Sequence, residues 1–360
     1  MNAVRVLPHV AVALERRVAV VALETSVLSQ GLPVPYNAQC ASRMVRAVES
    51  RGAVAALTAV ARGIATLGLT DEELARFLAR DGVRKVGSRD LGACIVQGAD
   101  GATTVAASLT IARAAGIEVM ATGGIGGVHR GAPFDESGDL TALSRTPVIV
   151  VCAGAKSILD LPATLERLET LGVPVIGFGT DELPGFFTRT TGLRVPQRSD
   201  SAAEIARIAH AHWALGERSA VLVVELPGFF AMNTGLALTA QLDTPEQIAA
   251  AWLAHRAVGC RSAMLVVQPP PADTALDRAM VDAAVQGAVR DADAAGIRGS
   301  ALTPFLLGAV LAATGGRSLP ANLALLESNA GLAADIAVAC AAAGACGPAY
   351  ADNGLARGAG

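Results

Sequence analysis

The sequence predicts an α/β fold in which a largely parallel sheet is flanked by helices. Short apolar runs rich in Val, Ile and Ala alternate with amphipathic stretches along most of the chain, a pattern typical of successive βα units. Of the 360 residues, 52% are hydrophobic but only 3% are aromatic, so small side chains form the core and let helices and strands pack closely. We expect one domain that covers residues 1–360.

In the first half of the chain, apolar runs and capping residues define the expected elements. Asn37 is expected to cap a helix that continues to about Arg51. Thr70 and Glu73 form a capping box in front of a helix over residues 71–79. Strands are expected over residues 17–23, 53–60, 63–69 and 117–121, a turn at 100–101, and another helix over 103–115.

In the second half, the alternation continues around one lysine. Residues 148–152 form an apolar run that predicts a buried strand, and a turn of small residues leads to Lys156, after which a helix is expected to start. The remaining expected elements are helices over residues 160–171, 202–215, 245–258 and 274–295, a strand over 174–178, and a helix after residues 303–307 that leads to a last loop and helix containing Asn322.

A tandem repeat occupies the second half. Residues 182–224 and 225–267 are two copies of one segment, offset by 225 − 182 = 43 residues, and 22 of the 43 positions are identical. Each copy has the pattern of a loop, a helix and a strand, and two copies are too few for a solenoid. The added unit must extend the sheet, bury its apolar strand elsewhere, or protrude and expose that strand to self-association.

Composition excludes several classes of protein. The net charge of −3, the absence of a basic stripe and the few aromatic residues argue against a nucleic-acid partner. No run of about 18 uncharged apolar residues suggests a membrane-spanning helix, and the N-terminus lacks the plan of a signal peptide. We therefore expect a cytoplasmic protein without a membrane partner. The six scattered cysteines form no C-x-x-C pair and are expected to be reduced core residues, Cys152 included.

Two side chains at predicted strand ends are candidates for chemistry. Lys156 lies just past a buried strand, at the edge where α/β proteins bind ligands, and its small apolar neighbours disfavour the ammonium form. Such a lysine can act as an amine nucleophile, although a solvated lysine would have the same local sequence. Glu24 follows the first predicted strand and is a candidate acid or base, or an ordinary loop acid.

A second group of candidates lies between these strands. Four glycines within residues 123–127 could let backbone N–H groups approach an anion, but the spacing matches no dinucleotide fingerprint. His129 ends this run and is either a titrating pocket residue or a structural one. Asp135, Glu136 and Asp139 suit a divalent cation or sugar hydroxyls, and they equally suit a helix N-cap.

Lys85 and Asn322 have weaker local support. Lys85 lies in an extended segment with two further cations and Asp90, which also fits a surface ion-pair cluster. Asn322 lies near an expected loop-to-helix boundary, where it would either orient a ligand through its amide or cap the helix.

The motifs gain meaning from their order along the chain, which is ALETS, KVGSRDL, GATTVAAS, ATGGIGGVHRG, DESGDL, VVCAGAKSILD and TGGRSLPANLALL. Together they resemble the pseudouridine-5'-phosphate glycosidase family over nearly the whole chain, apart from one copy of the repeat. The resemblance implies reversible cleavage of the C-glycosidic bond of pseudouridine 5'-phosphate to uracil and ribose 5-phosphate. It also implies a divalent metal, often Mn²⁺, and a homotrimer.

The resemblance also implies roles for single residues. Lys156 would attack C1' and open the ribose to an imine, while Glu24 would transfer a proton at the ring oxygen or the base. Asp135 matches the metal position. The phosphate would lie among the glycine amides and cationic side chains. The positions that match substrate contacts or polar pocket residues are Lys85, Val105, His129, Ser137, Gly138, Asp139 and Asn322.

The chain departs from the family pattern mainly in its duplication. Smaller differences occur at Thr25, Ser26, Gln30, Gly87 and Gly138. The family lacks the added 43 residues, and either copy could fill the single-copy position. Two other functions therefore stay open: a Schiff-base lyase for another sugar phosphate or C-glycoside, and an inactive paralogue disabled by the duplication.

Overall fold

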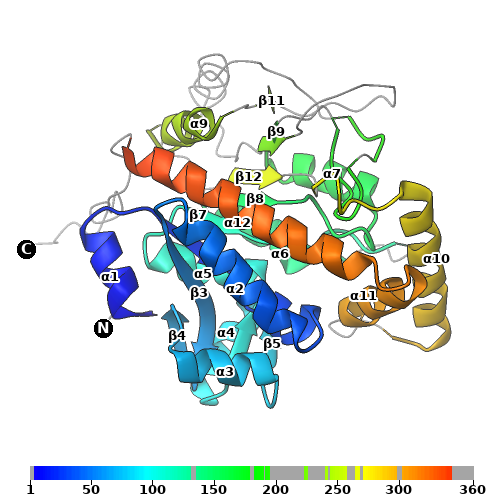
Figure 1. Cartoon of the computed structure of the whole chain (residues 1–360), viewed down its shortest axis with the longest axis horizontal. Coiled ribbons are helices and arrows are strands. Elements are labelled where there is room, and N and C mark those ends of the chain that lie inside the picture. The colour runs from blue at the N-terminus through cyan, green and yellow to red at the C-terminus, as the bar shows by residue number, and fades with distance from the viewer. Residues whose placement is uncertain are drawn as a thin grey trace, which may run out of the picture.

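The computed structural model describes the chain in ten stretches, residues 4–130, 135–178, 182–189, 191–194, 223–225, 240–241, 244–257, 264–267, 271–297 and 302–342. Figure 1 shows these stretches as one sheet with helices packed around it. The predicted helix over 202–215 lies outside the described residues.

The sheet is largely parallel, as predicted. Its main path runs β1-β4-β3-β2-β7-β8-β12-β10-β9-β11, and the short strands β5 and β6 attach beside β3. Among the pairings of these strands, only those of β3 with β4 and with β6 are antiparallel. In chain order the strands are Arg5–Val6, Val20–Leu23, Val54–Ala61, Ile64–Leu67, Arg84–Val86, Gly101–Thr103, Val119–Ala121, Ile149–Cys152, Val175–Phe178, Val223–Glu225, Ala240–Gln241 and Met264–Val267.

Helices cover the sheet. Helix α12 crosses in front of it in Figure 1, contacts β2, β7 and β8, and has α2 and α9 as neighbours. The described helices are α1 Pro8–Glu15, α2 Tyr36–Glu49, α3 Asp71–Ala79, α4 Leu91–Val96, α5 Val105–Ala114, α6 Gly138–Arg145, α7 Leu161–Thr170, α9 Pro245–Ala257, α10 Arg278–Ala294, α11 Leu302–Ala313 and α12 Ser318–Ala342, with single turns η1 Val27–Gly31 and η2 Ser88–Asp90.

Helix α12 is the longest described helix and is almost entirely a core element. It is the one described helix that is long and apolar enough to cross a membrane by length and composition. Most of its apolar stretch is nevertheless buried against the sheet and the neighbouring helices. Burial on this scale is how a helix that is apolar on most sides is stabilised inside a globular protein.

Several predicted boundaries were wrong because tertiary contacts decide them. Asn37 does not cap α2 but lies inside it, fully buried, and its amide donates to the carbonyls of Leu28 and Leu78. Gly101 belongs to strand β6 rather than to a turn, because it pairs with Val60 of β3. The helix expected after Lys156 is confirmed as α7, which begins at Leu161 and agrees with the predicted range 160–171. The predicted capping box at Thr70 and Glu73 is confirmed, whereas β1 and α1 were not predicted.

The strands that end the two repeats are neighbours in the sheet. Strand β10 ends the first copy and β12 ends the second, and they pair in parallel. Val223 pairs with Val266, and Val224 with Val267, so that paired residues differ by 266 − 223 = 43 positions, the repeat offset. Strand β12 also pairs with β8, and β10 with β9. The added strand thus extends the sheet, which is one of the three placements considered above.

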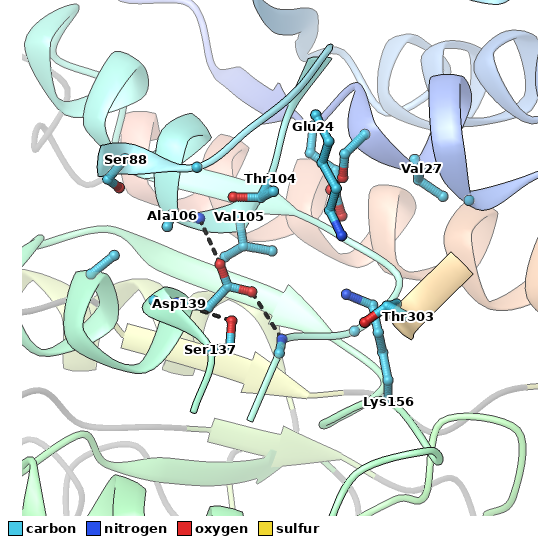
Figure 2. Close-up of a pocket in the computed structure, with 18 of the residues that line it drawn as sticks. Glu24, Val27, Ser88, Thr104, Val105, Ala106, Ser137, Asp139, Lys156 and Thr303 are labelled. Atoms are coloured by element: carbon cyan, nitrogen blue, oxygen red, sulfur yellow. Dashed lines mark hydrogen bonds between the residues drawn. The ribbon is translucent and has the colours of Figure 1, made fainter. Parts of the chain in front are cut away.

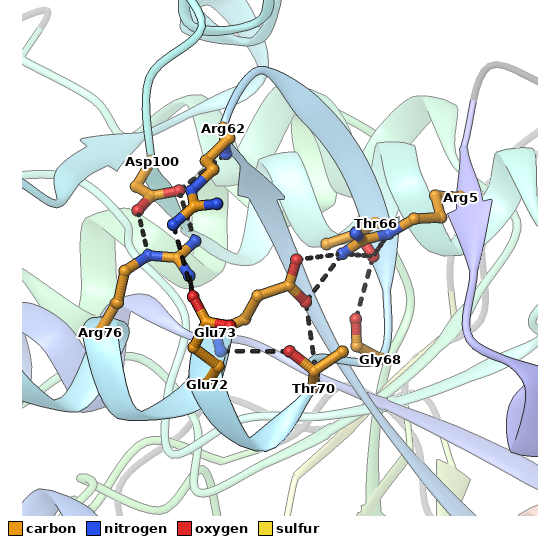
Figure 3. Close-up of polar contacts among 9 residues, drawn as sticks. All are labelled: Arg5, Arg62, Thr66, Gly68, Thr70, Glu72, Glu73, Arg76 and Asp100. Carbon is orange, nitrogen blue, oxygen red and sulfur yellow. Dashed lines mark hydrogen bonds and ion pairs between the residues drawn. The ribbon is translucent and has the colours of Figure 1, made fainter.

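A cluster of charged residues joins helix α3 to strand β1 and to the residue before β6 (Figure 3). Arg5 binds both carboxylate oxygens of Glu73, at 2.7 and 2.8 Å, and joins β1 to the start of α3. Arg76 donates to Asp100 at 3.0 Å, and the backbone N–H of Arg62 does so at 2.7 Å. Burial alone would raise the pKa of Asp100, but these hydrogen bonds and the guanidinium charges hold it below its usual range.

We expect deletion of residues 225–267 to leave a folded protein, because Val224 would then lead into the sequence that follows Val267 and β10 could pair with β8. Far-UV circular dichroism and thermal unfolding would measure this, with the full chain as control. A loss of cooperative unfolding would show that both copies are needed.

Asp100→Asn should destabilise the protein by roughly 1 kcal/mol at neutral pH, because it removes a charge-assisted pair with Arg76. The pKa of Asp100 is lower in the folded than in the unfolded chain, so its contribution is present above about pH 4 and is lost as pH falls through the folded pKa. Urea unfolding at pH 7 and near pH 3 would measure the difference. The exposed Asp81→Asn is the control, and an equal effect of Asp100→Asn at both pH values would contradict the prediction.

Candidate active site

One cavity of about 690 Å³ opens at the carboxyl ends of the central strands. It contains every side chain that the sequence singled out, although these residues come from segments up to 298 positions apart (322 − 24). The structure therefore brings the predicted group together, while their individual roles remain predictions. The residues are Glu24, Lys85, Val105, His129, Asp135, Ser137, Gly138, Asp139, Lys156 and Asn322.

Glu24 directly follows β2 and is only 5% exposed. Ser26 donates its hydroxyl to Oε2 at 2.5 Å, and the Thr122 hydroxyl donates to Oε1. A buried carboxylate requires such donors, because an unpaired one would lose its hydration without compensation. Glu24 is therefore not the exposed loop acid that the local sequence also allowed.

Lys156 lies in the loop between β8 and α7, on the opposite side of the cavity from Glu24 (Figure 2). Its backbone N–H donates to the carbonyl of Ile125 at 3.1 Å, which anchors this loop to the glycine-rich one. Gly154 has φ +85°, and a Cβ there would approach the carbonyl of Pro184 to 2.6 Å, so the loop needs glycine at this point. Helix α7 begins only at Leu161, capped by Asp160.

Lys85 lies on β5 and its side chain is largely buried in the same cavity. Burial lowers its pKa, and the positive charge of Lys156 lowers it further, while Asp139 and Glu24 act in the opposite direction. Two amines thus share one cavity, and the charge of Lys156 disfavours a proton on Lys85. An anionic ligand between them would relieve this repulsion.

Asp139 joins two backbone segments that form the cavity wall. Its carboxylate accepts the N–H of Ala106 at 3.0 Å, at the start of α5 beside Val105, and the N–H of Gly126 at 2.9 Å (Figure 2). Ser137 caps α6 by accepting the N–H of Asp139. The helix-cap interpretation is thus confirmed for Ser137, while Asp139 is 5% exposed and occupied by backbone donors.

The glycine-rich loop is only in part the open anion cradle that its composition predicted, because some of its backbone N–H groups already have protein acceptors. The N–H groups of Ile125, Gly126, Val128 and His129 already donate to protein acceptors. The glycines instead permit close packing, since a Cβ at Gly126 would approach the hydroxyl of Ser137 to 2.2 Å. Sequence alone could not show this, because the acceptors come from distant segments.

His129 and Asp135 face each other across this loop, with Nδ1 of His129 3.2 Å from Oδ1 of Asp135. Among the described residues, no group of three His, Cys, Asp or Glu side chains could enclose a metal ion. Asp135 remains partly exposed to the cavity, as suits a single carboxylate ligand to a hydrated ion that the substrate also binds.

Asn322 lies inside α12 rather than at a helix cap, and it is 8% exposed. Its Oδ1 has no hydrogen-bond partner among the described residues. A buried acceptor in that state is costly unless a ligand satisfies it, which favours the ligand-orienting alternative. The duplication therefore does not keep Asn322 out of the cavity.

Some residues of the site were not predicted. Thr122 follows β7 and donates its hydroxyl to Glu24. The sequence feature that could have indicated this residue is a hydroxyl side chain directly after a predicted strand. Phe186 of the first repeat lines the cavity against Gly124, and Thr303 enters it from α11. Nothing in the local sequence of Phe186 predicts this position.

The cysteine prediction agrees with the described core. Cys40, Cys94, Cys152 and Cys340 are buried, whereas Cys260 and Cys346 lie outside the described residues. Burial raises the pKa of Cys152 to about 12, which disfavours a thiolate at neutral pH. This residue therefore packs in the core and is not a nucleophile.

Comparison with known proteins agrees with this constellation. The family model described as indigoidine synthase A like protein matches residues 9–225 and again 224–339, so its two matches meet where the repeats meet. A pseudouridine-5'-phosphate glycosidase of Gemmatimonas aurantiaca is 58% identical over 91% of this chain and 93% of its own length. One of Herpetosiphon aurantiacus is 45% identical over 92% and 96%, respectively.

Two solved structures are also similar to this chain over nearly its whole length. The prealnumycin C-glycosynthase AlnA in complex with ribulose 5-phosphate is 34% identical, with a TM-score of 0.76 over 95% of this chain and 98% of that one. An indigoidine synthase A-like protein of Thermotoga maritima is 30% identical, with a TM-score of 0.74 over 93% and 95%. From motifs, fold and relatives together, the chain belongs to the pseudouridine-5'-phosphate glycosidase family.

Proposed function

We propose that the chain is an enzyme that reversibly cleaves the C-glycosidic bond of pseudouridine 5'-phosphate to uracil and ribose 5-phosphate. The observation on which the proposal rests is the presence of Lys156 and Glu24 on opposite sides of one cavity. An amine and a carboxyl group are what a nucleophilic route needs, and the curated relatives bear the name of this activity.

The proposed route begins with attack of the Lys156 amine on C1' of the ribose. A bond forms between Nζ and C1' and the bond from C1' to the ring oxygen breaks, while the Glu24 carboxylate takes a proton from the attacking nitrogen and passes it to the ring oxygen. The nitrogen lone pair then forms an imine as the bond from C1' to uracil C5 breaks, and C5 takes a proton. Water hydrolyses the imine, which releases ribose 5-phosphate and the free lysine.

The phosphate would bind through cationic side chains, together with those backbone N–H groups of the glycine loop that do not already donate to protein acceptors. Lys85, Arg89 and Arg145 line the same cavity and provide positive charge. A phosphate dianion beside Lys85 also offsets the repulsion between the two lysines. Asn322 offers an unpaired carbonyl oxygen to a sugar hydroxyl or a base N–H.

We further propose that Asp135 holds a divalent cation, Mn²⁺, and that the protein is a cytoplasmic homotrimer. The donor set is one carboxylate with His129 beside it, so the ion would complete its shell with water and substrate oxygens. When bound, the ion would supply positive charge beside the substrate. Asp135 and His129 would orient it at the mouth of the cavity.

A second candidate is formation or cleavage of another C-glycoside. It is favoured by the similarity to AlnA, whose structure contains ribulose 5-phosphate. Lys156 and Glu24 would suit either substrate, and uracil release distinguishes the two activities. An inactive paralogue is disfavoured, because all ten predicted residues line the cavity.

Purified protein with Mn²⁺ should release uracil from pseudouridine 5'-phosphate, and Lys156→Ala should lower kcat by at least about 10³-fold, because the nucleophile is lost. Borohydride with ribose 5-phosphate should add the sugar-phosphate mass at Lys156. Lys156→Arg, which keeps the charge but not the amine, is the matched control and should be equally inactive. An active Lys156→Ala enzyme or an adduct elsewhere would exclude this mechanism.

Sulfate affinity should fall as pH rises from neutral towards about 10, the usual lysine range, because the pKa of Lys85 is lowered and the ammonium form binds the anion. Sulfate keeps its charge over this interval, so the protein alone titrates. Calorimetry should find a flatter pH dependence for Lys85→Met than for the wild type. The same pH dependence in both proteins would contradict the assignment.

A further inference from the structure

The Glu24 carboxylate is held at both oxygens. Oε2 accepts the hydroxyl of Ser26, from the same loop, and Oε1 accepts the hydroxyl of Thr122, from the neighbouring strand end. Ser26 is only two residues from Glu24, in the same loop. Thr122 is the contact that fixes the carboxylate relative to the rest of the cavity.

Thr122 is itself fixed by its backbone. Its N–H donates to the carbonyl of Val151 on β8 at 3.0 Å, and its carbonyl accepts Nδ2 of Asn329 at 2.8 Å. Asn329 lies near the middle of α12. Thr122 is 1% exposed and Asn329 is 0% exposed. The Glu24 carboxylate is therefore connected through one residue to the sheet and to helix α12.

Asn329 is a polar side chain at a fully buried position of α12, where its neighbours on the helix are apolar. Leu326 and Ala333 nearby on α12 are buried and apolar, whereas Oδ1 of Asn329 has no partner among the described residues. A half-satisfied buried amide is destabilising relative to an apolar side chain of similar volume. Core packing therefore does not explain an amide at this position, whereas its hydrogen bond to the carbonyl of Thr122 does.

We infer that Thr122 and Asn329 are positioning residues that orient Glu24 for proton transfer, with Asn329 acting through Thr122. The inference rests on the proposed function, in which Glu24 transfers the proton. Thr122 holds one carboxylate oxygen, so the carboxyl group cannot rotate freely and its orientation towards the substrate is set before binding. Asn329 prevents Thr122 from shifting along the strand end.

The test compares kcat and KM for uracil release. Thr122→Val, which keeps the shape but removes the hydroxyl, should lower kcat roughly 10- to 100-fold, within the range of proton-transfer contributions, with little change in KM. Thr122→Ser should restore most of kcat. Asn329→Leu should lower kcat less, and the double variant should be no worse than Thr122→Val alone, because both act along one path.

The matched control is Thr314→Val, which removes a buried hydroxyl that bonds backbone carbonyls outside the cavity. It should leave kcat unchanged, and Thr122→Val should retain the borohydride adduct at Lys156. An unchanged kcat in Thr122→Val, or no rescue by Thr122→Ser, would overturn the inference.

If the wild type released no uracil, the proposed function would fail instead. Crystal structures of the wild type and Thr122→Val would then decide, and an unmoved Glu24 carboxylate would overturn the positioning role.

Discussion

The site depends on the parallel register of three central strands. Leu23 of β2 pairs with Ala121 of β7, which pairs with Val151 of β8. The next residues of β2 and β7 are Glu24 and Thr122, and they leave the sheet side by side, whereas β8 continues one residue further to Cys152. Because parallel strands end at the same edge, the backbone alone brings a carboxylate and its hydroxyl donor together, and the loop after β8 adds Lys156.

Charge balance is the second constraint on this cavity. Two lysines and several carboxylates are withdrawn from bulk water, and each needs a partner to offset lost hydration. Backbone amides serve Asp139, and hydroxyls serve Glu24. Lys85 has no comparable compensation, since burial and the positive charge of Lys156 lower its pKa. The protein is thus organised around groups that an anionic substrate completes.

Sequence predicted the parts that depend on local pattern. The parallel α/β sheet and the cap at Thr70 followed from strand runs and capping chemistry, and the gathering of ten residues was implied by the family resemblance of the motifs. It failed where distant partners decide the outcome, as for Asn37, whose amide joins two other elements, and for the N–H groups of Ile125 and Gly126, which donate to Gly154 and Asp139. The Asn329 contact spans 207 positions, so no window of sequence could contain both partners.

The in-register pairing of β10 with β12 also has a genetic consequence. The period of the repeat equals one complete loop, helix and strand, so any in-frame loss of 43 residues that starts between 182 and 225 leaves one continuous copy. After such a loss, every position of the repeat is still present once and in order, although some residues come from the first copy and the rest from the second. Loss of one period at any point between the two halves would therefore return the chain to single-copy length with the loop, helix and strand pattern intact.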